Sequence, residues 1–227
     1  MRGTQSNLTG VMIALALLPL VGACCSSGRA SPPDTQNAPA ESEVDRRVKE
    51  LLSGYEHVPS AEDWARIGTP EEVSAALVRI AASPEGQTLT AARATSSLAN
   101  FPRPEVARFL EQRIADPKAH PSLRGKAAIA LAAGFGDAQA GAIAPLFASR
   151  DEALREDAIR AFKRLVSPAA ERFLEARARL EPSERLRTVM GEARAAIAEA
   201  REARIKEGKL PDQIRDLPAI ADPGPIR

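Results

Sequence analysis

The sequence has only two cysteines, which are adjacent at positions 24 and 25. Adjacent cysteines pair only with strain, so a disulfide within a folded domain is excluded. A zinc site built on several thiolates is excluded as well, because no cysteine lies elsewhere in the chain.

Aromatic residues are also scarce, at 4% of the chain, although 44% of its residues are hydrophobic. Alanine, leucine and valine must therefore fill the core, and the first two are the best helix formers. No run alternates β-branched and polar residues as a half-buried strand would. We therefore expect an all-α fold.

The sequence also lacks an excess of charge of either sign, since its 31 Lys and Arg residues nearly balance its 30 Asp and Glu residues. A nucleic-acid-binding protein needs a basic face. The chain has no net charge excess to supply one, and we expect no nucleic-acid partner.

Side chains typical of catalysis are few. The two histidines, His57 and His120, each fall near a proline in an expected turn, and neither stands in an HxxxH or HExxH pattern. The run Gly134-Phe135-Gly136 is too short for a nucleotide-binding fingerprint and is expected to end a helix. We therefore expect no catalytic residue, no metal and no cofactor.

The N-terminus carries the clearest local pattern. Thirteen apolar residues from Val11 to Ala23 follow a polar start that contains Arg2. This run is too short to span a bilayer but matches the core of a signal peptide. We expect residues 1–23 to be a removed signal peptide. Residues 24–42, rich in serine, proline and small polar residues, should form a flexible tether.

The segment Leu20-Val21-Gly22-Ala23-Cys24 resembles the lipobox of bacterial lipoproteins. The resemblance implies that Cys24 is lipidated and that its acyl chains hold the protein in a membrane. Ordinary signal-peptide cleavage at the same small residues is the alternative. In lipoproteins a residue other than aspartate after the cysteine, here Cys25, favours the outer membrane facing the periplasm. The inner membrane and the cell surface stay open.

The middle of the chain repeats with steps of 33 and 31 residues. Each copy has a small residue, another small residue three positions later, and then a large apolar residue. A period of this length made of paired helices is the signature of a stacked helical array. The copies are Ala94-Ser97-Leu98, Ala127-Ala130-Leu131 and Ala158-Ala161-Phe162.

The segments 123–131 and 154–162 resemble the second helix of short bacterial HEAT-like repeats, with the pattern L-R-x-x-A-x-x-A-L. The resemblance implies a short α-solenoid of about four helix pairs, which we place at 69–207. An N-terminal helical cap is expected at 43–68 and a proline-rich, extended or disordered tail at 208–227. Tetratricopeptide repeats and a plain helical bundle are the alternative folds.

An arginine follows the opening leucine of three units, at Arg124, Arg155 and Arg187. In HEAT-like repeats the comparable arginine often bonds an aspartate in the preceding turn, which implies Asp116 and Asp151 as partners. The alternative is a basic stripe that binds an acidic partner.

The second helices of HEAT-like repeats normally line the binding surface, which implies Arg93, Lys126 and Arg160 as partner contacts. The two resemblances together imply a non-catalytic protein-binding or scaffold module in the cell envelope. Membrane lipid would hold its anchor, and an envelope protein would be its partner. An enzyme or enzyme accessory of the HEAT-like lyase type is one alternative, and an envelope spacer without a specific ligand is another.

Overall fold

The computed structural model describes residues 42–54, 58–83, 89–209, 214 and 217–226. Within these ranges the chain forms helices and turns and contains no strand, so the all-α prediction is confirmed. The expected signal peptide, Cys24 and nearly all of the tether lie outside the described residues, and so does His57.

The described helices follow one another with short connections. They are α1 (Glu43–Ser53), α2 (Ala61–Ala65), α3 (Pro70–Ala82), α4 (Leu89–Ser97), α5 (Pro104–Ala115), α6 (Pro121–Phe135), α7 (Ala140–Ile143), α8 (Glu152–Phe162), α9 (Pro168–Ala178) and α10 (Glu184–Lys206), with 3-10 segments η1 (Leu98–Asn100), η2 (Gly136–Gln139) and η3 (Ala144–Ala148).

Local sequence signals explain where several helices begin and end. The Thr69 hydroxyl accepts a hydrogen bond from the Glu72 backbone N–H, and the Glu72 carboxylate accepts one from the Thr69 backbone, which completes a capping box at α3. Gly136 ends α6 at φ 67°, and Gly208 follows α10 at φ 64°. Glycine favours this left-handed conformation because it has no Cβ.

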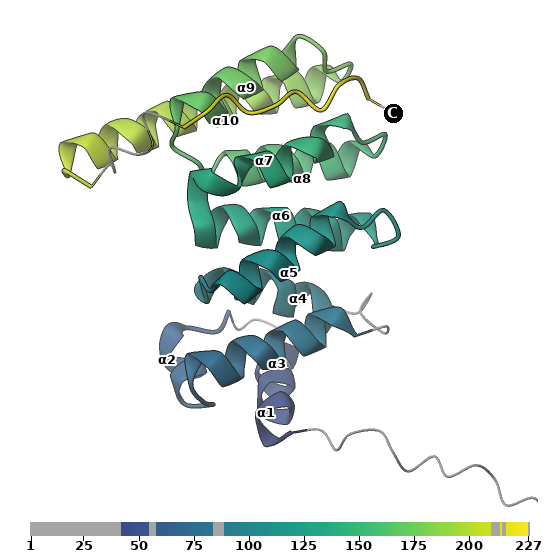
Figure 1. Ribbon diagram of the computed structural model, residues 1–227, viewed down its shortest axis with the longest axis vertical. Coiled ribbons are helices and arrows are strands. Elements are labelled where there is room, and N and C mark those ends of the chain that lie inside the picture. The colour runs from purple at the N-terminus through teal and green to yellow at the C-terminus, as the bar shows by residue number, and fades with distance from the viewer. Residues whose placement is uncertain (1–41, 55–57, 84–88, 210–213, 215–216, 227) are drawn as a thin grey trace, which may run out of the picture. The chain divides into compact units, whose positions relative to one another are not determined.

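Neighbouring helices pack together in sequence order (Figure 1). The pairs are α3 with α4, α5 with α6, the α7–η3 segment with α8, and α9 with α10. The second members also touch in order, from α4 to α6, α8 and α10, while α3 touches α5 and α5 touches α7. First helices therefore pack beside first helices, and second helices beside second helices.

One expected helix is broken. The spacing of Ile143, Leu146 and Phe147 predicts a single helix, but α7 ends at Ile143 and a 3-10 segment carries the other two. Pro145 explains the break, because proline lacks the N–H that an α-helix needs and crowds the preceding turn. The three apolar side chains are nevertheless buried, as their spacing suggests.

Three phenylalanines join successive pairs in the core. Phe147, Phe162 and Phe173 lie on η3, α8 and α9, and their ring centroids are 5.0 to 5.1 Å apart. Small residues allow close approach elsewhere: a Cβ at Gly134 would lie 2.9 Å from the Ala99 carbonyl oxygen. Three of the six phenylalanines of this chain therefore pack where layers meet, and small residues bring backbones together.

A second set of arginines links three of the first helices, α3, α5 and α9, to the layer before each of them. These arginines stand nine residues after the proline that begins the helix (70 to 79, 104 to 113, 168 to 177). Sequence reasoning missed this set, although its spacing is regular. The Arg79 guanidinium bonds Asp45 Oδ1 of α1 at 2.7 Å, Arg113 bonds the Ala81 carbonyl oxygen at 2.9 Å, and Arg177 bonds the Phe147 carbonyl oxygen at 2.8 Å.

Residues Pro121–Ala148 are long and apolar enough, by length and composition, to cross a membrane. Within the fold, α6 touches α4, α5 and α8, so it is surrounded by other helices. It buries apolar side chains such as Leu123 and Leu131 against them. This position accounts for the apolar composition, because a core helix meets protein on most of its surface.

Candidate functional site

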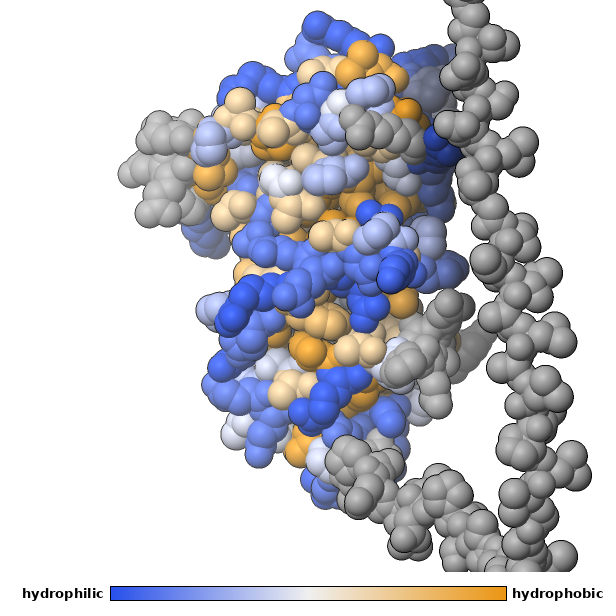
Figure 2. Space-filling view, turned by 45° about the vertical axis from the view of Figure 1, so that its right-hand side comes forward, coloured by the Kyte–Doolittle hydropathy of each residue, from blue (hydrophilic) through white to orange (hydrophobic). Residues whose placement is uncertain are grey.

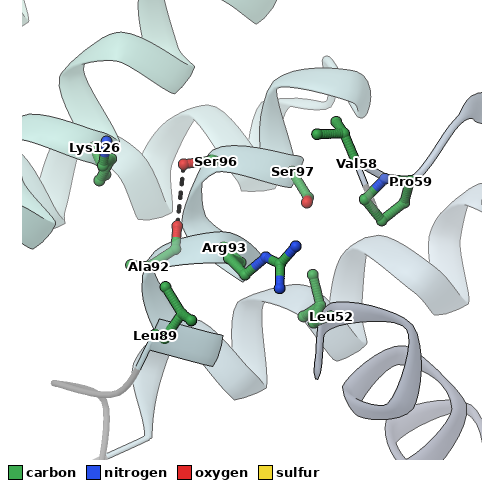
Figure 3. A pocket seen from close by; sticks show the side chains of 9 residues that line it. All are labelled: Leu52, Val58, Pro59, Leu89, Ala92, Arg93, Ser96, Ser97 and Lys126. Carbon is green, nitrogen blue, oxygen red and sulfur yellow. Dashed lines mark hydrogen bonds between the residues drawn. The ribbon is translucent and has the colours of Figure 1, made fainter. Parts of the chain in front are cut away.

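A groove lies where α1 and the segment before α2 face the second helices α4 and α6 (Figure 3). Its volume is about 270 Å³, and most of its lining is apolar. Val58 and Leu89 at its edge are 86% and 66% exposed, which is unusual for large apolar side chains. The lining residues are Leu52, Val58, Pro59, Leu89, Ala92, Arg93, Ser96, Ser97 and Lys126.

Two of the three predicted second-helix contacts meet in this groove. Arg93 comes from α4 and Lys126 from α6, at equivalent positions one residue before the first small residue of each repeat. Figure 3 shows the Arg93 guanidinium between Leu52 and Pro59, with Lys126 at the other end. The groove therefore combines an apolar lining with two cations.

The equivalent position on α8 carries an acid, Asp157, which the sequence pattern indicates as part of a solvated helix face. A Cβ at Gly125 would lie 2.1 Å from Asp157 Oδ2, so only glycine lets this side chain lie against α6. Burial raises the pKa of Asp157, while the charges of Lys126 and Arg160 act in the opposite direction. Lys126 therefore lines the groove and also acts through its charge on a partly buried carboxylate.

Arg160, the third predicted contact, lies one layer further along on α8. Its guanidinium bonds Glu156 at 2.5 Å and Asp157 at 3.3 Å, and its side chain is 57% exposed. Glu156 also pairs with Arg185 of α10 at 2.7 Å. Arg160 therefore belongs to a charge network on α8 and α10 and does not line the groove.

The repeated arginines hold the turns within the helix pairs. Arg124 Nε donates to the Ile114 carbonyl oxygen at 2.9 Å, and Arg187 Nη1 donates to the Glu181 and Pro182 carbonyl oxygens at 2.8 and 3.0 Å. Carbonyls at the end of a helix have no partner within the helix, and a nearby cation stabilises them.

Arg155 makes the same type of contact with the Ser149 and Arg150 carbonyl oxygens, at 2.9 and 3.2 Å. It also forms a two-bond ion pair with Glu181, in which Nε and Nη2 are each 2.9 Å from a carboxylate oxygen. Both residues are 4% exposed. A continuous basic stripe through Arg155 is therefore wrong, because this guanidinium faces the interior.

The aspartates expected beside these arginines have other roles. Asp151 caps α8 by accepting hydrogen bonds from the Ala153 and Leu154 N–H groups. Asp116 accepts one from the Lys118 N–H. The predicted arginine–aspartate ladder is therefore wrong in its partners. Main-chain carbonyls and Glu181 take the place of Asp116 and Asp151.

His120 caps α6, where its Nδ1 lies 3.3 Å from the Ser122 backbone nitrogen and 2.8 Å from the Ser122 hydroxyl. The expectation of an exposed turn histidine is confirmed. Among the residues that the structure describes, no group of three or more His, Cys, Asp or Glu side chains is placed to hold a metal ion.

A larger recess, of about 420 Å³, lies between α2, the start of α3 and the end of η1. Trp64 and Phe101 line it and pack edge to face, with centroids 6.1 Å apart. Among the described residues, no charged side chain lines this recess, whereas the groove has two. The groove is therefore the stronger candidate, because charged groups can fix the orientation of a ligand.

Comparisons of the chain with protein-family models, with curated proteins and with solved structures give no match.

Proposed function

We propose that this protein is a non-catalytic protein-binding module of the bacterial cell envelope. The observation that carries the proposal is the groove in which Arg93 and Lys126, from two successive second helices, flank an apolar lining. A partner segment with a large apolar side chain between two acidic residues fits this chemistry. The envelope location rests on the N-terminal sequence alone.

The proposal includes a finer description of the fold, as a short α-solenoid of about four HEAT-like pairs over residues 69–207, with α1 and α2 in the cap at 43–68. The ordered contacts of first with first and second with second helices support this description. Stacked helix pairs create an extended surface to which every layer contributes side chains. Arg93 and Lys126 are then neighbours because they occupy the same position in adjacent layers.

The described surface of the protein is mixed in hydropathy. The face in Figure 2 carries separate hydrophobic patches among hydrophilic residues. Interfaces of non-obligate complexes have a similar composition, with an apolar centre and a polar rim. The expected partner therefore binds through one anchoring apolar side chain with charges around it.

A photo-activated cross-linking residue at Ser96, an exposed position in the groove, tests this site in living cells. We expect one discrete cross-linked protein. The combined change Arg93→Glu and Lys126→Glu should reduce its yield about tenfold, because reversing two partly exposed charges costs on the order of 1–2 kcal/mol of binding energy. Quantified bands after purification of the chain give the measurement.

The matched control reverses two charges in turns away from the groove, Lys118→Glu with Arg150→Glu. This variant should keep the full cross-link yield. Equal loss in both variants would show a general effect of charge and would contradict the groove. A chain that supports its cellular role without any specific cross-link would favour the envelope spacer instead.

The lipid anchor is the second part of the proposal, and it has its own test. Cys24→Ala should abolish labelling of the chain by radioactive palmitate and release it from the membrane fraction, because no acyl chain can then be attached. Cys25→Ala is the matched control and should keep both. A Cys24→Ala chain that stays membrane-bound to the same extent would refute the anchor.

A further inference from the structure

The C-terminal segment 217–226 lies along α9 (Figure 1). Its anchor is Arg177, which is 2% exposed. Arg177 Nη1 donates to Asp222 Oδ1 at 3.0 Å and to the Gly224 carbonyl oxygen at 2.8 Å. A buried guanidinium needs such acceptors, because an unpaired charge in the interior is strongly unfavourable.

Apolar and conformational features fix the register of this segment. Ile220 packs against the hydrophobic core, beside a recess of about 200 Å³ on α9. The Asp222 carboxylate also accepts a hydrogen bond from the Gly224 N–H, and Gly224 adopts φ 82°, which favours glycine. An apolar residue and an aspartate two positions later are therefore the features that hold this segment on α9.

The C-terminal segment does not supply acceptors for all the hydrogen-bond donors of Arg177. Arg177 Nε is buried without a hydrogen-bond acceptor among the described residues, and the Asp222 side chain is 60% exposed. The carboxylate is therefore open to water and to competitors, while the guanidinium stays fixed by the Phe147 carbonyl oxygen. A ligand whose carboxylate also accepts a hydrogen bond from Nε would bind better, because an arginine fork holds a carboxylate through two bonds.

We propose that the face of α9 around Arg177, which the C-terminal segment covers within its own chain, is a second protein-binding site. An extended partner segment with an apolar residue two positions before an aspartate would take its place. The site uses a first helix, whereas the groove at Arg93 and Lys126 lies on second helices. The two sites share no residue, so a test that refutes one proposal leaves the other unaffected.

A fluorescent peptide with the sequence of residues 217–226 tests this site by fluorescence anisotropy on the full chain in detergent. We expect the peptide to bind the Asp222→Ala chain about 10- to 100-fold more tightly than the unchanged chain. In the unchanged chain the tethered segment competes at an effective concentration on the order of millimolar. Arg93→Glu with Lys126→Glu should leave this binding unaltered.

The matched control is a peptide with Asp222→Asn, which should bind the Asp222→Ala chain at least about tenfold more weakly because it lacks the charge that pairs with Arg177. Equal binding of the two peptides would overturn the proposal, and so would equal binding to the two chains. Dimers formed by exchange of the segment would overturn it as well, since the occupant would be a second copy.

A second measurement uses the unchanged chain, so it does not depend on how the variant folds. Excess unlabelled peptide should displace the tethered segment and speed hydrogen exchange in residues 217–226 of the chain, with no change in α4 and α6. An unchanged exchange rate at millimolar peptide would show that the site admits no other segment.

Discussion

Replacing Arg155 by alanine is expected to lower the free energy of unfolding by about 3–5 kcal/mol, because it leaves the Glu181 carboxylate buried without its counter-charge. Glu181 would keep only the Ser183 N–H at 3.1 Å. Denaturant unfolding followed by circular dichroism gives the measurement. The loss should be large because α8 and the turn before α10 are joined through this pair.

Arg187→Ala is the matched control, since Arg187 occupies the same repeat position but is exposed and bonds only carbonyl oxygens. Its loss should be about 1 kcal/mol. The double change Arg155→Met with Glu181→Met should recover part of the stability, because no buried charge then remains. Similar losses at Arg155 and Arg187 would show that burial of the ion pair is not the cause.

Replacing Phe162 by alanine is expected to lower the free energy of unfolding by about 3–5 kcal/mol. The ring is fully buried, and it packs edge to face on Phe147 and tilted against Phe173. The change removes both ring contacts and leaves a cavity where two helix pairs meet. The same denaturant titration measures it.

Phe109→Ala makes the same change at a half-buried position, where the Arg113 guanidinium lies 5.5 Å from the ring centre. Its loss should be about 1–2 kcal/mol, because less apolar surface returns to water. A loss at Phe162 no larger than that at Phe109 would contradict a central role for the phenylalanine cluster.

The two sets of arginines stabilise different contacts, one within a helix pair and the other between successive layers. Arg124, Arg155 and Arg187 bond carbonyl oxygens at the turn inside their own pair. The set at 79, 113 and 177 bonds the layer before. Regular spacing therefore marks structural residues at these positions, while Arg93 and Lys126 occupy a different repeat position and line the groove.

Some of the candidate site was predictable from the sequence. The resemblance to HEAT-like repeats implied Arg93 and Lys126 as partner contacts, and both line the groove from adjacent second helices. The apolar lining from Leu52, Val58 and Leu89 was not predictable, since it depends on how α1 and the segment before α2 pack onto the repeats. The packing of Ile220 and Asp222 on α9 was not predictable either, because a proline-rich tail has no periodic pattern that would indicate which helix it contacts.

The sequence by itself determined the helical class, the caps at Thr69 and Gly136, and the positions of the apolar and small residues, because these depend on neighbours a few positions away. Tertiary structure alone decided which of the arginines at equivalent repeat positions is buried. Arg155 and Arg187 share one position in the repeat, yet only Arg155 meets a carboxylate, Glu181, brought to it from the next layer. That meeting joins residues 26 positions apart, and local pattern carries no information about it.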